Sequence, residues 1–211
     1  MRSFLLVLIL IFSLQSWTKA DDIRDFQIEG ISVGDNLLDH FTINQINKAY
    51  KNTYPKSKKF YGLQFDLTDY ETYKHIQVHI KSGSNYIVSS IIGGEFFDNI
   101  NKCYQKQKII VRDLKKTFSN AEVNEYKTTY PDDPKSSIKI AEFYLSNFDV
   151  VVSCTDWSKK AETTGNTDNL RVEISSLEFS KFITIRPHPS KMRFSGIYAP
   201  KVHPYNAPPL W

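Results

Sequence analysis

Apolar residues recur along the chain with two different spacings, and each spacing predicts a different kind of secondary structure. Alternation of apolar and polar residues at 59–67 and 73–80 is typical of strands with one buried face. Apolar residues every three or four positions between 98 and 118 predict an amphipathic helix. The expected elements are, in chain order, helices at 33–41 and 43–51, strands at 59–67, 73–80 and 86–92, the helix at 98–118, and strands at 123–130, 138–145, 150–154 and 170–177.

Residues that favour helix starts and chain turns mark several boundaries of these elements. Ser32-Val33-Gly34-Asp35 and Thr42-Ile43-Asn44-Gln45 resemble capping boxes, in which two side chains bond the first free amides of a helix. Gly93-Gly94 is expected to end the strand before it. The segment 179–185 is compatible with one further strand.

The order of the elements predicts the α+β class. Short loops between successive strands imply antiparallel pairing, so we expect an antiparallel sheet with helices packed on one face. Two arrangements fit the order, either one continuous sheet or two helix-plus-meander units in tandem. We favour the continuous sheet, within a single domain over residues 21–180.

The first twenty residues have the pattern of a secretory signal peptide. Arg2 precedes an apolar run from Phe4 to Phe12, which is shorter than the roughly twenty residues that a membrane-spanning helix needs. Cleavage is expected after Ala20. The mature chain is then exported to the periplasm or the extracellular space and is soluble once the signal peptide is removed.

The chain contains two cysteines, Cys103 on the predicted long helix and Cys154 on a predicted strand. An even number of cysteines in an exported chain is most simply explained by a disulfide, so we predict that these two are bonded. Two buried free thiols are the alternative. Two isolated cysteines make an incomplete zinc site, and no sequence motif indicates a metal or a cofactor.

Charge is nearly balanced over the expected mature chain. Residues 1–20 contain two of the 27 Lys and Arg residues and none of the 23 Asp and Glu residues, which leaves a net charge of +2 for residues 21–211. A dedicated nucleic-acid binder carries a dense basic footprint, so we expect no nucleic-acid partner.

The C-terminal residues 181–211 form a basic tail that is rich in proline. Six of the nine prolines lie between Pro187 and Pro209, and no acidic residue follows Glu178. The tail is compatible with weak contact to an anionic surface and, as the favoured alternative, with an extended arm lying on its own domain. The cations available for such contact are Lys181, Arg186, Lys191, Arg193 and Lys201.

Candidate catalytic residues are few. Gly30-Ile31-Ser32-Val33-Gly34 matches the nucleophile motif of serine hydrolases, although the sequence before it is too short for the strands that precede such a motif. Helix capping explains Ser32 more economically. His75 and His79 lie four positions apart on one strand, about 13 Å from each other, and cannot chelate one metal ion together. We expect both on the solvent-exposed face of that strand.

These observations predict a non-enzymatic binding or interaction module that contacts an unknown protein or envelope component through a sheet face or edge. The exposed strand positions carry Tyr, His, Gln and Lys, which suit contact surfaces. The alternatives are a small serine hydrolase that uses Ser32 and an envelope-associated structural protein.

Three stretches of the chain resemble a group of small exported proteins of unassigned function from AT-rich bacterial genomes. They are residues 20–23, residues 28–39 and residues 54–61. The resemblance covers the expected mature chain up to about residue 180. It implies export, and it assigns no catalytic residue.

Overall fold

The computed structural model describes residues 23, 26–54, 57–66, 72–130 and 133–183. The expected signal peptide and residues 184–211 of the expected tail lie outside this part of the chain. The elements are, in chain order, η2 (Leu37–Asp39), α2 (Ile43–Lys48), β1 (Tyr50–Tyr54), β2 (Ser57–Asp66), β3 (His75–Lys81), β4 (Val88–Phe96), α3 (Ile100–Thr117), β5 (Glu122–Tyr130), β6 (Asp133–Tyr144), β7 (Phe148–Asp156), α4 (Lys159–Glu162), β8 (Asn169–Ser176) and α5 (Leu177–Ile183).

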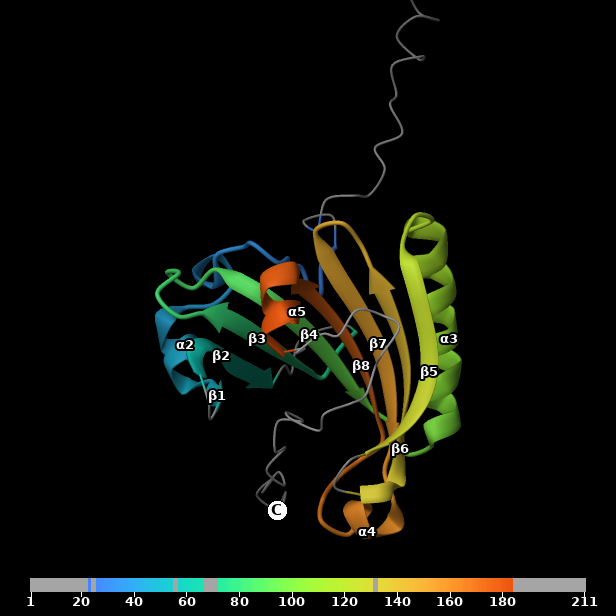
Figure 1. Cartoon of the computed structure of the whole chain (residues 1–211). Helices are drawn as coiled ribbons and strands as arrows, with labels where there is room; N and C mark the ends of the chain where they lie inside the picture. Colours follow the sequence, from blue (N-terminus) through green and yellow to red (C-terminus); the bar gives the residue numbers. More distant parts are fainter. Residues whose placement is uncertain (1–22, 24–25, 55–56, 67–71, 131–132, 184–211) are drawn as a thin grey trace, which may run out of the picture.

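All eight strands belong to one antiparallel sheet with the order β1-β2-β3-β4-β8-β7-β6-β5 (Figure 1). The last of the described strands, β8, lies between β4 and β7 and joins the two meanders. Ile174 of β8 pairs with Ile91 of β4 on one side and with Val150 of β7 on the other. The predicted α+β class and the continuous sheet are therefore confirmed.

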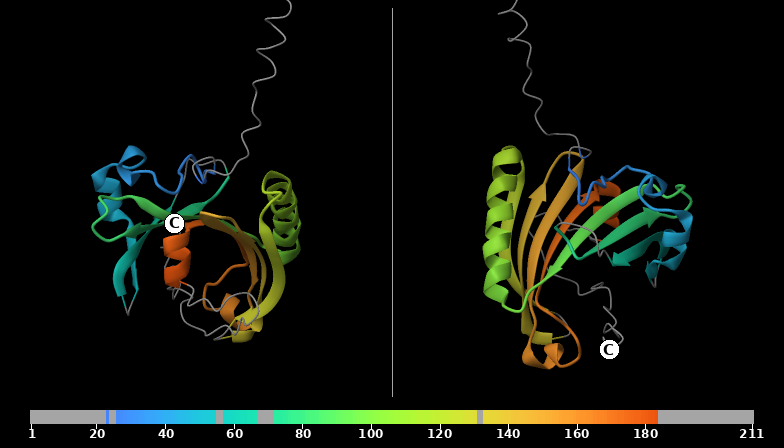
Figure 2. Two further views of the ribbon diagram at one scale, coloured as in Figure 1. Left: turned by 45° about the horizontal axis from the view of Figure 1, so that its top comes forward. Right: turned by 180° about the vertical axis from the view of Figure 1, so that it is seen from behind.

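The sheet is strongly curved, and its two faces differ in what covers them (Figure 2). On the outer face, α3 packs over β7 and β8, while η2 and α2 contribute Leu37 and Ile46 to the same hydrophobic core. On the inner face lies α5, whose Phe179 contacts Phe60 and His79. The side chains of the outer face alternate along each strand with those of the inner face.

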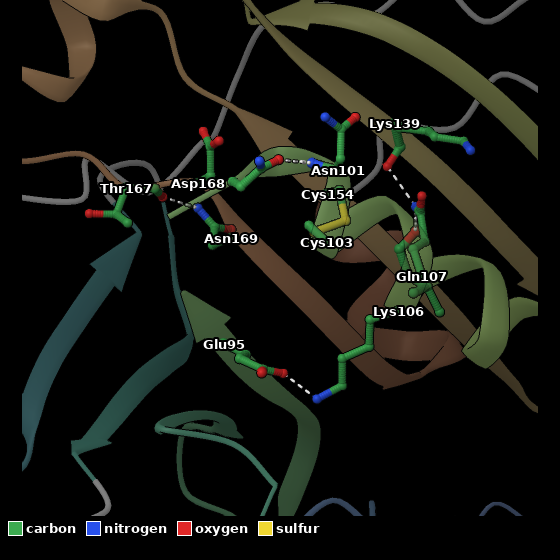
Figure 3. The surroundings of a disulfide bond; sticks show 12 residues. Glu95, Asn101, Cys103, Lys106, Gln107, Lys139, Cys154, Thr167, Asp168 and Asn169 are labelled. Atoms are coloured by element: carbon green, nitrogen blue, oxygen red, sulfur yellow. Dashed lines mark hydrogen bonds and ion pairs between the residues drawn. A yellow bond between two sulfur atoms is a disulfide. The ribbon is translucent and has the colours of Figure 1, made fainter. Parts of the chain in front are cut away.

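Helix α3 is attached to the sheet by a disulfide and by a buried amide (Figure 3). Cys103 and Cys154 of β7 are disulfide-bonded with their Cα atoms 6.0 Å apart, which confirms the predicted pairing. One turn further along α3, the Gln107 Nε2 donates to the carbonyls of Lys139 and Val152, at 2.9 and 3.0 Å. Gln107 is only 2% exposed, so it ties α3 to two neighbouring strands inside the core.

Replacing Gln107 by Ala is expected to lower the free energy of unfolding by about 1–3 kcal/mol, because two buried carbonyls lose their donor. Urea unfolding of the native chain and of Gln107→Ala measures this difference. The exposed neighbour Lys108 provides a matched control, since Lys108→Ala removes no buried hydrogen bond. Equal midpoints for the native chain and Gln107→Ala would contradict this role.

The prediction of a helix at 33–41 is wrong for most of that range, because the backbone of Gly34 and Asp35 forms hydrogen bonds with the sheet. Gly34 N–H donates to the Val88 carbonyl, and Val88 N–H donates to the Asp35 carbonyl. Ser32 therefore caps no helix, although Asp35 does accept from the Ser32 N–H at 2.8 Å. A 3₁₀ helix begins only at Leu37, capped by Asn36.

The second capping box is confirmed. The Thr42 side chain accepts from the Gln45 N–H, and the Gln45 side chain accepts from the Thr42 N–H. The helix that it starts is shorter than the expected 43–51, because α2 ends at Lys48 and strand β1 begins at Tyr50. The backbone of β1 pairs with β2, from Tyr50 opposite Gln64 onwards.

Strand β4 continues through Gly93-Gly94 to Phe96, so the expectation that these glycines end a strand is wrong. Rings from β3 and the residues before it occupy the space beside them. A methyl group at Gly93 would overlap the Tyr73 ring, and one at Gly94 would overlap the His75 ring. At the other end of the domain, residues 177–183 form α5 instead of the further strand considered at 179–185, and α5 crosses the expected domain boundary at residue 180.

Candidate ligand-binding face

The inner face of the sheet is lined mainly by polar side chains, in contrast to the apolar outer face. Strand β8 shows the contrast. Leu170, Val172 and Ile174 lie on the outer face, in the hydrophobic core, and the residues between them lie on the inner face. The register places the inward residues of the five strands β4, β8, β7, β6 and β5 in neighbouring rows. The polar residues in these rows include Ser90, Arg171, Glu173, Ser175, Asp149, Glu142, Tyr144 and Tyr126.

A hydrogen-bonded cluster occupies the centre of the inner face. The Ser175 hydroxyl lies 2.9 Å from both the Ser90 Oγ and the Glu173 Oε1. Arg171 pairs with the other carboxylate oxygen of Glu173 at 3.5 Å. The Glu173 side chain is 16% exposed and that of Arg171 is 35% exposed, so both charges are partly withdrawn from water yet still accessible.

A second carboxylate lies two strands away, on β6. Glu142 accepts hydrogen bonds from two tyrosine hydroxyls, Tyr126 at 3.1 Å and Tyr144 at 2.6 Å. Burial raises the pKa of Tyr126 well above its ordinary value, and the charge of Glu142 raises it further. The phenol therefore stays protonated and donates to the carboxylate at any physiological pH. Ionised carboxylates accept about four hydrogen bonds, so Glu142 retains acceptor capacity for a ligand.

Under α5, the inner face closes into a buried aromatic cluster. The Tyr54 hydroxyl lies 2.9 Å from His79 Nδ1, and Phe179 of α5 packs on the His79 ring. Burial lowers the pKa of His79 to about 3, and the Arg171 charge contributes in the same direction. His79 is only 4% exposed, so the predicted solvent-exposed position of this histidine is wrong. The helix that covers it was not expected from the sequence.

Aromatic rings also lie at the far end of the face, away from α5. The His75 ring stacks on Phe96 with the ring centres 4.9 Å apart, and Phe96 is 48% exposed. At the C-terminal end of β5, the rings of Tyr130 and Trp157 are in contact, with their centres 4.7 Å apart. These rings add apolar contact area beside the carboxylates and the guanidinium.

Ser32, the candidate nucleophile, is buried on the outer side of the domain. Its hydroxyl donates to the Phe26 carbonyl at 3.1 Å. A histidine and a carboxylate do lie nearby, since Asp35 Oδ2 is 3.1 Å from His40 Nε2. However, the Asp35 carboxylate accepts from the backbone amide of Ser32. The Ser32 hydroxyl donates to the Phe26 carbonyl, whereas in a serine hydrolase the nucleophile donates to a histidine ring.

His75 and His79 both lie on the inner face but at opposite ends of β3, one beside Phe96 and the other beneath α5. Within the described residues, no three His, Cys, Asp or Glu side chains are grouped as metal ligands are. None of the described helices combines the length and apolar character that crossing a membrane requires.

The residues that make the inner face were not singled out from the sequence. The signal was present in β8, where Arg171, Glu173 and Ser175 alternate with core residues. Alternation shows that these side chains share a face. It does not show that β4 and β6 bring Ser90 and Glu142 beside them, because that depends on strand order.

Comparison of the chain with protein-family models, with curated proteins and with solved structures found no match.

Proposed function

We propose that the protein is a non-enzymatic binding module that holds a cationic ligand on the inner face of its sheet. The observation that carries the proposal is the pair of partly buried carboxylates, Glu142 and Glu173, each held in place by hydroxyl donors. Asp149, which is 4% exposed, adds a third acidic side chain to the same face, and among the described residues of strands β4 to β8 Arg171 is the one guanidinium on it. The excess of negative charge favours a ligand that carries amino or guanidino groups.

The arrangement suits binding more than catalysis. Tyrosine and serine hydroxyls fix the two carboxylates, which lowers the conformational entropy that these side chains lose when a ligand binds. Charge-assisted hydrogen bonds from an ammonium group to a carboxylate are the strong class of hydrogen bond. The exposed Phe96 ring supplies apolar contact at the end of the face away from α5.

We further propose that the protein works outside the cytoplasm. The Cys103–Cys154 disulfide fits an oxidising compartment. The signal-peptide pattern of residues 1–20 and the resemblance to small exported proteins support the same location. A fusion of residues 1–30 to a reporter that is active only after export tests this proposal.

The binding proposal is tested with the peptide Lys-Lys-Lys as the probe. We expect the double variant Glu142→Gln/Glu173→Gln to weaken its binding at least tenfold, because each lost charge-assisted hydrogen bond is worth about 1.5–3 kcal/mol. Isothermal titration calorimetry at low and at physiological salt measures the dissociation constants.

The matched control is Asp39→Asn/Glu162→Gln, which removes the same charge from exposed positions on η2 and α4. This control is expected to bind the peptide within twofold of the native chain. Equal weakening in the two double variants would mean that only the overall charge attracts the peptide. That result, or no binding by the native chain, would refute the proposal.

A further inference from the structure

A groove of about 340 Å³ runs between α3 and the strands β5 and β6, on the face opposite to the candidate ligand-binding face. It exists because α3 packs over β7 and β8 and leaves the outer side of the sheet edge uncovered. Along β5 the outward residues, Glu125, Lys127 and Thr129, are exposed, whereas the residues between them are half-buried. We name this feature the α3–β6 groove.

Four cations and one carboxylate line the α3–β6 groove. Lys108, Arg112 and Lys115 follow each other at four and three positions on α3, so they share one side of the helix. Lys139 faces them from β6, and the single lining carboxylate, Glu125, is paired with Lys115. Lys127 of β5 stands opposite Lys139 in the strand register and adds a further positive charge beside the groove.

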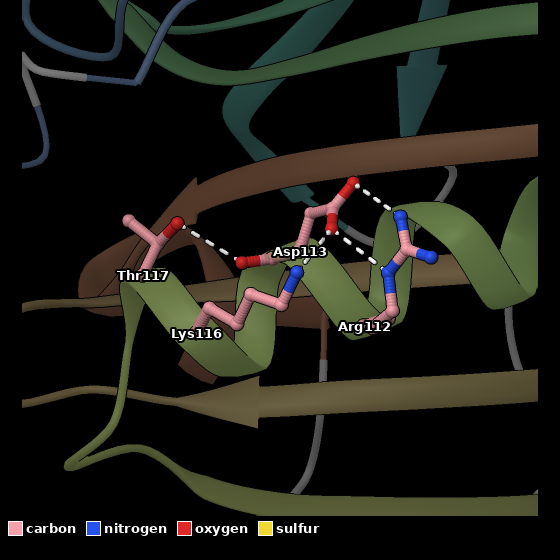
Figure 4. Close-up of polar contacts among 4 residues, drawn as sticks. All are labelled: Arg112, Asp113, Lys116 and Thr117. Carbon is pink, nitrogen blue, oxygen red and sulfur yellow. Dashed lines mark hydrogen bonds and ion pairs between the residues drawn. The ribbon is translucent and has the colours of Figure 1, made fainter.

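Few acidic groups offset these charges. Arg112 donates to both oxygens of Asp113, at 3.0 and 3.3 Å, and Lys116 lies 3.5 Å from the same carboxylate (Figure 4). Asp113 is thus shared by two cations on the solvent side of α3. In the described part of the chain, Lys108, Lys127 and Lys139 form no ion pair, so the groove retains a net positive charge.

We propose that the α3–β6 groove binds an acidic polysaccharide, a chain with regularly spaced carboxylate or sulfate groups. The three cations of α3 are spread over about 10 Å of helix, which suits a row of anionic groups better than one small anion. Arg112 adds a planar guanidinium that matches carboxylate and sulfate oxygens.

Two features argue against other anionic partners. The apolar side of α3 is held on the sheet through Cys103, Gln107 and Val111, so it is not available to enter a lipid layer. The exposed large apolar side chain of α3, Ile109, does not line the groove, and protein partners usually need such an anchor. Binding that rests on charge and hydrogen bonds fits a polysaccharide.

Heparin, a sulfated polysaccharide, is the probe for this proposal, and the native exported chain is the protein to use. We expect Lys108→Gln/Lys139→Gln to raise the dissociation constant of a heparin octasaccharide at least tenfold at 50 mM NaCl. The charge-matched control is Lys159→Gln/Lys160→Gln on α4, which is expected to change it by less than twofold. Circular dichroism and thermal unfolding show whether the variants keep the native fold.

Three results would overturn the proposal. Equal weakening by the two double variants would show that charge elsewhere in the chain holds the polysaccharide. Absence of heparin binding by the native chain would show that the groove has no such ligand. Equally tight binding of polyglutamate or of anionic phosphatidylglycerol vesicles, lost in Lys108→Gln/Lys139→Gln, would assign the groove to an acidic protein or a membrane.

Discussion

Reduction of the Cys103–Cys154 disulfide is expected to lower the free energy of unfolding by about 4 kcal/mol. The two cysteines are separated by 51 positions, and in the chain-entropy model a closed loop of that length restricts the unfolded state strongly. Globular domains have a total stability of about 5–15 kcal/mol, so the loss is a large share of it. Urea unfolding with and without dithiothreitol measures the difference.

The reduced protein is expected to remain folded under mild conditions. Gln107 and Val111 still attach α3 to the sheet when the sulfur bridge is open, and both are buried. The double variant Cys103→Ala/Cys154→Ala serves as the control, because dithiothreitol has no disulfide to act on in it. A native chain whose unfolding midpoint does not move on reduction would contradict a stabilising role for this bond.

Acidification is expected to destabilise the protein through His79. In the unfolded chain this histidine has its ordinary pKa of about 6.5, whereas burial in the folded chain lowers the pKa to about 3. The folded state thus binds the proton more weakly. The stabilising effect is fully present above about pH 6.5 and is lost as the pH falls towards 3, at up to about 1.4 kcal/mol per pH unit.

Comparison with His79→Gln isolates this effect from the titration of carboxylates, which the two proteins share. Unfolding free energies are measured in urea at pH 7, 5 and 4. The difference in unfolding free energy between the native chain and His79→Gln is expected to shrink step by step as the pH falls. A difference between the two proteins that stays constant with pH would show that His79 is not the group responsible.

Local patterns in the sequence were sufficient for much of the fold. Alternation of apolar and polar residues predicted strands at β2, β3 and β8, and helical spacing predicted α3 within two residues of its ends. These patterns work because one face of each element must be buried. The disulfide was predicted on a different ground, from an even number of cysteines in a chain expected to be exported.

The errors lie where backbone or rings make contacts with distant parts of the chain. Ser32-Val33-Gly34-Asp35 has a capping pattern, yet its backbone bonds to Val88, fifty or more positions away. Gly93-Gly94 resembles a strand end, but Tyr73 and His75 fill the space that side chains would occupy. Local preference is worth too little free energy to outweigh such contacts.

The sequence by itself determined that Arg171, Glu173 and Ser175 share one strand face, because side chains alternate strictly along a strand. Only the tertiary structure decided what stands beside them. The insertion of β8 between β4 and β7 places Ser90 next to Ser175 and puts Glu142 two strands from Glu173. The same assembly lays α5 over His79 and leaves the α3–β6 groove uncovered. Strand order and helix placement depend on how much apolar surface each arrangement buries across the whole domain, and no local spacing encodes that sum.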